Sequence, residues 1–509
     1  MVVTILVGWL CFFLFQQIDL VTADLGRFIE NGEQIFSRGW QDVLHTNYYS
    51  FTHFQYPFLN HHWGTGVVFY LIIQKAGGFL SLHLFAIFLT ITTFLLLFKV
   101  AKREAGLVVA TLLSLFLIPL MAYRKEIRPE IFSYFFVAVF FHILWAYRNK
   151  EISQRWLWLL PLLEIFWVNL HIYFFLGPAI IGAFLLENLI LWVKNKKKFL
   201  KSILFIGGVV VLATFVNPFG WKGAFHPLNI YGNYGYRVLE EQSVWFLQNL
   251  NIHNPVFVLF QISLGLLGLS FLWVFVKKRK DFSLVSFFLM SGFAFMACWS
   301  IRNISLFAFI ALPIFAKNIK ILWPNLNVTS LNKKIFVSVL SLIIVFTVCV
   351  FYNRSLPMNS SSFGLGLIKK QESAMNFFKD NDLQGPIFNN YDIGGYLIYY
   401  LFPQEKVFVD NRPETYSSEF FQDVYIPMQE NDEIWNQKSS EYGINAIIFY
   451  WHDATPWGQQ FLITRVEDDE WAPVFVDDRI IIFLKRNNLN KEVIDKFEIF
   501  KDAFRVSQN

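Results

Sequence analysis

Long runs of apolar residues fill most of the chain up to residue 352, and short polar or basic stretches separate them. A helix needs about 20 apolar residues to cross the hydrocarbon core of a bilayer, and most of the runs approach that length. The pattern therefore predicts a polytopic α-helical membrane protein with about eleven to thirteen transmembrane or re-entrant helices. The runs lie near 1–20, 80–99, 106–122, 130–147, 156–168, 172–193, 202–217, 254–276, 283–299, 304–316 and 335–352.

Two apolar segments near the N-terminus differ from the other runs. No basic residue precedes the first run and no clear cleavage site follows it, so a first transmembrane helix fits better than a signal peptide. Segment 64–76 is shorter than a span requires. We expect it to be a surface or re-entrant helix, which leaves residues 19–79 as an extracytoplasmic loop.

Clusters of basic residues recur after every second predicted span. The positive-inside rule places such clusters in the cytoplasm. It therefore assigns the connections 123–129, 169–171, 218–253 and 300–303, and the chain after 353, to the extracytoplasmic side. The basic clusters lie at 102–103, 148–155, 194–201, 277–280 and 317–334.

One of these extracytoplasmic connections is basic, against the rule. Residues 123–129 carry Arg124, Lys125 and Arg128. Their side chains either snorkel from a helix end towards the interface or form a site for an anion. The sequence leaves both interpretations open.

The pattern changes after residue 353. Long apolar runs give way to short strand-like segments, such as 445–450 and 479–485, which alternate with helical periodicity. We expect a membrane domain at 1–353 and a soluble α/β or α+β domain at 354–509. By the same count of sides, the soluble domain is extracytoplasmic.

Composition supports a membrane protein and narrows its partners. Hydrophobic residues make up 55% of the 509 positions and charged residues only 16%, and the mean hydropathy is +0.42. Ordinary soluble domains have about 25% charged residues. The net charge of +5 is modest, and no basic motif indicates nucleic acid. Cys11, Cys298 and Cys349 lie within apolar runs, so we expect no disulfide framework.

Polar and charged residues gather at the predicted extracytoplasmic ends of the spans. Such residues are costly in hydrocarbon, so they usually face protein or a water-filled cavity. Their presence on one side predicts a single hydrated site open to the extracytoplasmic face. The first loop contributes Asp24, Arg27, Asn60, His61, His62 and Trp63, and the later connections contribute Arg128, Glu130, Asn169, His171, Asn217, Arg302 and Asn303.

Each group also has a structural interpretation. Asp24 and Arg27 can form an i,i+3 surface pair, and Asn217 can simply end a helix. Arg302 can snorkel to the interface. The histidines at 61–62 can lie at the interface as well, and without further ligands at recognisable spacing they do not predict a metal site.

A lipid-linked phosphosugar fits this set of groups because it is anionic and reaches the protein from the membrane. Arg128, Arg302 or His171 would bind its phosphate, since a guanidinium group matches the geometry of phosphate. Asp24 would take the proton of the acceptor hydroxyl while the anomeric carbon is displaced from phosphate. Trp63 would stack on a sugar ring.

Three motifs in the first loop, taken in order, resemble the C-type (GT-C) superfamily of multi-spanning glycosyltransferases. The superfamily includes protein mannosyltransferases and aminoarabinose transferases, and the likeness is greatest to bacterial members. Asp24, Phe28 and Gly32 match the first motif, residues 49–52 (YSFT) match the second, and residues 60–63 (NHHW) match the third.

The resemblance implies an inverting transfer from a polyprenyl-phosphate-linked sugar to a glycan, lipid or protein acceptor. It places the reaction on the extracytoplasmic face of the cell membrane, with Asp24 as base or organiser. Later motifs in the same order are 128–134 (RPEIFSY), 167–171 (WVNLH), 217–220 (NPFG), 301–303 (IRN) and 387–416 in the tail.

Two positions depart from the superfamily pattern. Asn47 stands where relatives have an aspartate, and His62 stands where they have a glutamate. Each change removes a carboxylate. The activity, and any dependence on a divalent cation as cofactor, are therefore open at this point.

Two other functions are alternatives. A transporter or flippase of a lipid-linked intermediate would place polar residues near the midplane and often has inverted repeats, which are not visible here. A non-catalytic relative would use the membrane part as a scaffold and the tail as a binding module. In the tail, the glycines 394–395 and the charged residues Asp410, Arg412 and Glu414 indicate either a structural turn or a ligand site.

Overall fold

A computed structural model describes residues 1–37, 39–195, 201–229, 232, 234–324, 334–335, 337–346 and 363–504. The chain forms two compact units. We call Met1–Gln17, His83–Pro227 and Val238–Leu365 the helical unit, and Ile18–Leu82, Leu228–Arg237 and Gly366–Asn509 the mixed unit. Cys349 and the predicted domain boundary at 353 lie outside the described residues.

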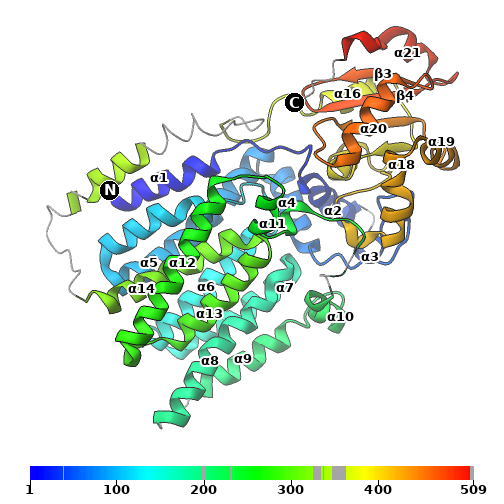
Figure 1. Cartoon of the computed structure of the whole chain (residues 1–509). Coiled ribbons are helices and arrows are strands. Elements are labelled where there is room, and N and C mark those ends of the chain that lie inside the picture. Colours follow the sequence, from blue (N-terminus) through cyan, green and yellow to red (C-terminus); the bar gives the residue numbers. More distant parts are fainter. Residues whose placement is uncertain are drawn as a thin grey trace. The chain divides into compact units, whose positions relative to one another are not determined.

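The helical unit is a bundle of apolar helices (Figure 1). Among the described residues, five helical segments are long and apolar enough to cross a membrane: Gly78–Met121, Glu130–Arg148, Ile172–Lys194, Pro255–Lys277 and Ile301–Leu322. Shorter apolar helices are Val2–Leu14, Lys201–Ala213, Leu284–Trp299 and Val337–Phe346. The prediction of a polytopic helical membrane protein is confirmed.

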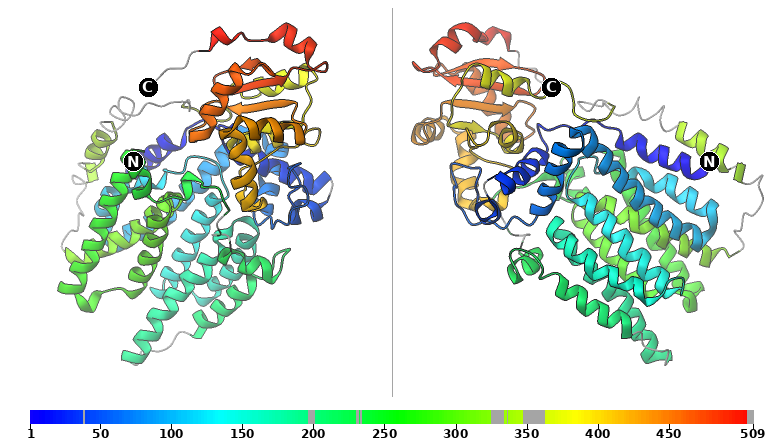
Figure 2. Two further views of the ribbon diagram at one scale, coloured as in Figure 1. Left: turned by 45° about the vertical axis from the view of Figure 1, so that its right-hand side comes forward. Right: turned by 180° about the vertical axis from the view of Figure 1, so that it is seen from behind.

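Figure 2 shows the helices of this unit from two further directions. They are α1 (Val2–Leu14), α5 (Gly78–Met121), α6 (Glu130–Arg148), α7 (Leu159–Leu170), α8 (Leu176–Asn195), α9 (Lys201–Ala213), α10 (Trp221–Phe225), α11 (Val244–Asn249), α12 (Pro255–Lys277), α13 (Leu284–Trp299) and α14 (Ile304–Leu322). Short 3-10 turns include η1 (Gln154–Trp158), η2 (Ile172–Phe175), η4 (Leu239–Glu241), η5 (Arg279–Asp281) and η6 (Ile301–Asn303).

The 44-residue helix α5 contains the break between two predicted spans. At Gly106 the backbone has φ 82° and ψ 169°, which is not helical and which glycine adopts without a steric penalty. The break follows directly on the basic residues at 102–103. The two apolar runs at 80–99 and 106–122 are therefore two helical arms of one element.

Side-chain caps begin several of the later helices. Asn254 Oδ1 accepts the Val256 N–H at 2.9 Å and Pro255 occupies the first position of α12. Ser243 Oγ accepts the Phe246 N–H at 3.2 Å and so caps α11. Such caps satisfy N–H groups that have no partner within the helix, and proline at the first position needs none.

The mixed unit contains a four-stranded sheet in the order β1-β2-β4-β3. β1 runs parallel to β2, and β4 runs antiparallel to β2 and β3. Phe388 pairs with Ile447, and β3 has a register shift between Pro473 and Phe475. The strands are β1 (Ile387–Asn389), β2 (Ala446–Tyr450), β3 (Trp471–Val476) and β4 (Ile480–Lys485), which confirms a tail with both strands and helices.

The helices of the mixed unit come from the predicted first loop and from the tail. The loop forms α2 (Leu25–Ser37), α3 (Trp40–His45) and α4 (Trp63–Ala76). The tail forms α16 (Ser373–Asp380), α17 (Gly394–Leu401), α18 (Pro427–Glu430), α19 (Asp432–Glu441), α20 (Pro456–Glu467) and α21 (Lys491–Phe497), with turns η7 (Tyr391–Ile393), η8 (Pro413–Thr415), η9 (Phe420–Tyr425) and η10 (Lys501–Ala503).

Glycines allow α2 to approach two other helices closely. A Cβ atom on Gly66 of α4 would lie 2.7 Å from Phe28 O, and a Cβ atom on Gly26 would lie 2.6 Å from Gly395 O of α17. Gly32 in turn faces the Gly66 carbonyl group. The first loop and the tail therefore fold together, and one of the two tail glycines serves this close packing.

Segment 64–76 forms most of α4, whose 14 residues are fewer than a span needs. The side that carries Gly64, Thr65, Gly66 and Phe69 is buried. The placement of α4 as a surface or re-entrant helix stays a prediction.

The connection 218–253 passes from one unit into the other. Tyr236 belongs to the mixed unit, where its ring stacks on Tyr391 with centroids 4.3 Å apart and lies 5.1 Å from Phe421. Gly235 precedes it with φ 77° and packs against Ser418. At Val238 the chain returns to the helical unit, where it forms the turn η4.

Candidate functional site

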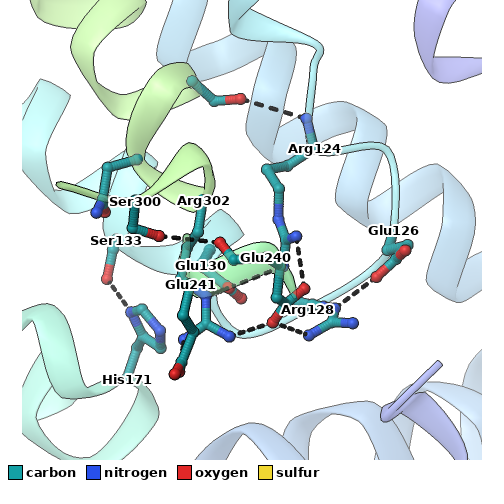
Figure 3. Close-up of polar contacts among 12 residues, drawn as sticks. Arg124, Glu126, Arg128, Glu130, Ser133, His171, Glu240, Glu241, Ser300 and Arg302 are labelled. Atoms are coloured by element: carbon teal, nitrogen blue, oxygen red, sulfur yellow. Dashed lines mark hydrogen bonds and ion pairs between the residues drawn. The ribbon is translucent and has the colours of Figure 1, made fainter. Parts of the chain in front are cut away.

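Connections that the sequence places on one side of the membrane meet at a cluster of ionised groups in the helical unit (Figure 3). Arg124 and Arg128 lie on the connection between α5 and α6, and Glu130 opens α6. Arg302 lies in η6 before α14, and Glu240 lies in η4. We call these five residues the arginine–glutamate cluster.

Glu240 is the common partner of the three arginines. Arg124 Nη1 lies 2.8 Å from Glu240 Oε2, and Arg128 Nη1 lies 2.9 Å from Oε1. Arg302 Nη2 contacts the same Oε1 atom. Charge-assisted hydrogen bonds of this kind are stronger than neutral ones. Glu240, on the connection 218–253, thus binds guanidinium groups from two other connections, 123–129 and 300–303.

Three further carboxylates complete the ion pairs, and the first, Glu126 Oε2, lies 2.6 Å from Arg128 Nε. Arg124 Nη2 lies 3.4 Å from Glu130 Oε1, and Arg302 Nη1 lies 3.4 Å from Glu241 Oε1. Arg302 Nε is 4.0 Å from Glu130 Oε1 and has no hydrogen-bond acceptor within the described part of the chain. The cluster therefore still holds an N–H group that a further acceptor would satisfy.

The arginines keep Glu240 ionised. Burial raises the pKa of Glu240, but the charges of Arg124, Arg128 and Arg302 outweigh burial and hold that pKa well below its ordinary value. Burial likewise lowers the pKa of Arg124, but the charges of Glu240, Glu130 and Glu126 together more than offset it, so that pKa is raised. At neutral pH the cluster is a set of charged pairs rather than an open cationic pocket.

His171 lies beside this cluster as a buried neutral imidazole. Burial lowers the pKa of His171 to about 4, although the Glu130 charge opposes this effect. Its Nδ1 atom is 2.6 Å from Ser133 Oγ, which also accepts the Trp167 Nε1–H at 2.7 Å. Because the indole already donates to Ser133, the arrangement favours the serine hydroxyl as donor to Nδ1. His171 is therefore neutral at neutral pH, with Nδ1 as the acceptor and Nε2 as the protonated nitrogen.

The three asparagines named from the sequence in this unit bind the protein's own groups. Asn303 Oδ1 accepts the Tyr173 hydroxyl at 2.8 Å, and Asn303 Nδ2 donates to Met296 O at 3.0 Å. Asn169 Nδ2 donates to two backbone carbonyls, at 2.7 and 2.8 Å. Asn217 Nδ2 donates to the carbonyls of residues 214 and 220. Asn169 and Asn217 bond to backbone carbonyls and Asn303 to a carbonyl and a hydroxyl, and a role for any of them in substrate binding stays a prediction.

The first-loop residues Asp24 and Arg27 lie at the start of α2 in the mixed unit. Asp24 directly precedes the helix, is half-buried, and its carbonyl accepts the Phe28 N–H at 3.1 Å. Arg27 is only 4% exposed. Burial lowers the pKa of Arg27, and the nearby Asp24 charge restores it only in part. Its Nε has no hydrogen-bond partner in the ranges that the structure describes.

The charged residues of the tail lie close to the same helix and form a tight pair. Arg412 donates from Nε to Asp410 Oδ1 at 2.7 Å and from Nη2 to Asp410 Oδ2 at 2.6 Å. Arg412 Nη2 also donates to Asn47 Oδ1 at 3.0 Å, and the Arg412 charge acts on Arg27. Burial raises the pKa of Glu414 nearby. Asn47 therefore contacts an arginine that Asp410 already neutralises.

Residues 60–63 connect the loop to α4. Asn60 Nδ2 donates to Val43 O at 3.2 Å, and His61 Nδ1 lies 3.2 Å from Leu59 O. The His62 ring packs edge-on against Phe28, with centroids 5.5 Å apart, and the half-buried Trp63 begins α4. A search of the described residues finds no group of three side chains that could hold a metal ion.

Sequence reasoning found the arginines but missed their carboxylate partner. Glu240 and Glu241 lie in the connection 218–253, which the count of sides places with Arg128 and Arg302. A search for countercharges on that side would have found this acidic pair. The structure brings Arg128, Glu130, His171 and Arg302 together in the helical unit, and Asp24 and Arg27 together in the mixed unit.

The sequence matches no protein-family model and no curated protein sequence. Its structure is similar to that of the archaeal oligosaccharyltransferase AglB from Archaeoglobus fulgidus, solved with an inhibitory peptide and a dolichol-phosphate. The TM-score is 0.61 at 10% identity, over 93% of this chain and 72% of AglB. A structure of the A. fulgidus enzyme tethered to an acceptor peptide gives 0.58 at 11% identity, over 96% of this chain and 74% of that one.

ArnT from Cupriavidus metallidurans, bound to undecaprenyl phosphate, is also similar. The TM-score is 0.52 at 12% identity, and the alignment covers 96% of this chain and 97% of ArnT. AglB and ArnT are GT-C glycosyltransferases. The GT-C fold that the motifs predict is therefore confirmed along most of the chain.

Proposed function

We propose that this chain is a membrane glycosyltransferase that transfers a sugar from a polyprenyl-phosphate donor to an acceptor on the extracytoplasmic face of the cell membrane. The convergence of Arg124, Arg128 and Arg302 at one end of the helical unit carries the proposal. Guanidinium groups bind phosphate well because their planar N–H groups match its oxygens. The GT-C fold adds support, since proteins with this fold have been solved with dolichol-phosphate and undecaprenyl phosphate.

The reaction requires a phosphate site and a base. Arg128 and Arg302 would hold the donor phosphate, and His171 would add a hydrogen bond. The acceptor oxygen attacks the anomeric carbon, the bond from that carbon to the phosphate oxygen breaks, and its electron pair leaves on polyprenyl phosphate. The hydroxyl proton passes to a carboxylate, and attack from the opposite side inverts the anomeric centre.

Asp24 is our candidate for that carboxylate. It stands immediately before α2, and the close contact of Gly26 with Gly395 fixes the first turn of that helix. A positioned base of this kind typically contributes about a hundredfold or more to the rate. Arg27 lies one turn along, and its charge interacts with that of Asp24.

A non-catalytic lipid-phosphate-binding protein is the second candidate. Asn47 and His62 replace two acids of the superfamily pattern, and that observation favours it. Under this reading the chain would bind a polyprenyl phosphate and transfer nothing.

The two candidate functions differ in whether the protein turns over a lipid-linked sugar donor. Purified full-length chain in lipid nanodiscs is given a panel of undecaprenyl-phosphate-linked hexoses and pentoses, and release of undecaprenyl phosphate is measured. We expect release with at least one donor, and a loss of about a hundredfold or more in Asp24→Asn. Asp42→Asn, which removes an exposed carboxylate from the same loop, is the control. Binding of undecaprenyl phosphate without turnover of any donor would support the second candidate instead.

A further inference from the structure

We infer that the Glu240 carboxylate holds the place of the donor phosphate in the unliganded protein and is exchanged for that phosphate when the donor binds. This role rests on the proposed function. The ligand is a phosphate ester whose oxygens accept hydrogen bonds from three guanidinium groups.

The geometry around Glu240 is that of a small bound oxyanion. Its two oxygens accept from Arg124 at 2.8 Å, from Arg128 at 2.9 Å and from Arg302. Each of these arginines also contacts a second carboxylate, so none of them depends on Glu240 alone for its countercharge. A phosphate group, with more oxygens, could take these same donors and also reach Arg302 Nε, which now lacks an acceptor among the described residues.

Of the two carboxylates in the cluster, Glu240 is the one placed to leave. Glu130 begins the helix α6 and is 6% exposed. Glu240 lies in the three-residue turn η4, and its side chain is 18% exposed against 8% for that of Glu130. The turn itself is fixed by its backbone, since Ser300 Oγ donates to Glu240 O at 2.9 Å and Ile301 N donates to Gln242 O at 2.9 Å. A rotation of the Glu240 side chain therefore suffices to vacate the site.

Charge balance favours exchange over simple addition. The three guanidinium groups already contact four carboxylates, those of Glu126, Glu130, Glu240 and Glu241, so a further anion without the loss of one carboxylate would add to an excess of negative charge. A polyprenyl-phosphate-linked sugar is a phosphodiester with one negative charge, the same as the carboxylate it would replace. The product is a phosphomonoester with a charge between about −1.5 and −2 at neutral pH. The cluster would hold this product more tightly than the donor, and the returning Glu240 would assist its release.

The test compares anion binding in wild type and Glu240→Gln, as full-length chain in nanodiscs. One arm titrates undecaprenyl phosphate and the other titrates inorganic phosphate. We expect Glu240→Gln to bind undecaprenyl phosphate about tenfold or more tightly than wild type, since the competing charge is gone. Glu241→Gln removes a charge from the adjacent residue, whose described ion pair is with Arg302 alone, and should change the affinity by about twofold or less.

Equal or weaker binding in Glu240→Gln, with wild-type binding and turnover intact, would overturn the exchange and leave the proposed function standing. A wild type that binds no undecaprenyl phosphate and releases none from any donor would defeat the proposed function itself. A gain confined to the inorganic phosphate arm would assign the site to free phosphate and overturn the lipid assignment.

A second measurement does not depend on the fold of the glutamine variant. A spin label is attached at Leu239→Cys, an exposed position in η4, with Cys11, Cys298 and Cys349 replaced by serine. Binding of undecaprenyl phosphate should change the spectrum of the label, because the neighbouring Glu240 side chain moves while the backbone of η4 stays in place. An unchanged spectrum at saturating lipid would contradict the exchange.

Discussion

Arg412 Nη2 donates to Asn47 Oδ1 at 3.0 Å, across 365 positions of the chain. The same guanidinium group is held by both oxygens of Asp410. An arginine from the tail thus contacts the position where the superfamily motif that the first loop resembles has an acid. Because Asp410 already supplies the negative charge, an amide at position 47 completes the contact without adding a second buried carboxylate.

This arrangement predicts that Arg412→Met destabilises the mixed unit. Removing one partner of a buried ion pair leaves the other charge uncompensated, at a cost of about 3–5 kcal/mol. Thermal unfolding of the full-length chain in detergent, followed by limited proteolysis of the tail, measures the effect. The control is Arg486→Met, which breaks the solvent-exposed pair with Glu498 and should cost about 0–1 kcal/mol. Equal losses in the two variants would contradict a special role for Arg412.

The close approach of α2 and α4 predicts a large effect of Gly32→Ala. The added methyl group would meet the Gly66 carbonyl, which belongs to a helix backbone and cannot turn aside. Overpacking of this kind costs about 1–3 kcal/mol. Gly208→Ala in α9 adds the same methyl group with no atom within 4 Å, and it should be neutral or slightly stabilising. The midpoint of thermal unfolding distinguishes the two, and a harmless Gly32→Ala would show that α2 and α4 are further apart.

Arg128→Gln is predicted to weaken binding of undecaprenyl phosphate by about tenfold, because a hydrogen bond from a charged group is lost. Titration in nanodiscs measures this change, with Arg279→Gln in the exposed turn η5 as a charge-matched control. Wild-type affinity in Arg128→Gln would remove Arg128 from the phosphate site.

His171 predicts a dependence of stability on pH. Its pKa is about 4 in the folded chain, whereas an unperturbed histidine has a pKa of about 6.5. As the pH falls below about 6.5 the unfolded chain therefore binds the proton first, and stability declines until about pH 4. His171→Gln should flatten this part of the stability profile in thermal unfolding between pH 4 and 7. The exposed His253→Gln should leave the slope as in wild type.

Much of the helical unit is predictable from local pattern, because length and apolar content alone decide whether a segment can span a bilayer. Most of the predicted runs correspond to helices of the structure, and the apparent gap between 99 and 106 is the break at Gly106. The arginines were predictable too, since basic residues on the unexpected side of a membrane need a reason.

The partner of those arginines was not predictable in the same way. Glu240 lies in a polar loop, and no spacing relates it to Arg128 or Arg302, which are 112 and 62 positions away. The packing of the first loop against the tail was also not predictable from the sequence pattern. It depends on glycines that allow backbones to touch, as at Gly26 and Gly395, and a single glycine in a helix does not reveal its neighbour.

The two edge strands of the sheet in the mixed unit are poor templates for pairing with a second copy of the chain. At one edge β1 has only three residues, and at the other β3 carries Pro473 next to a shift of register. Proline removes an N–H group that an incoming strand would use, and a bulge twists the edge away from a partner. Neither edge of the sheet therefore offers a regular row of hydrogen-bonding groups for edge-to-edge aggregation.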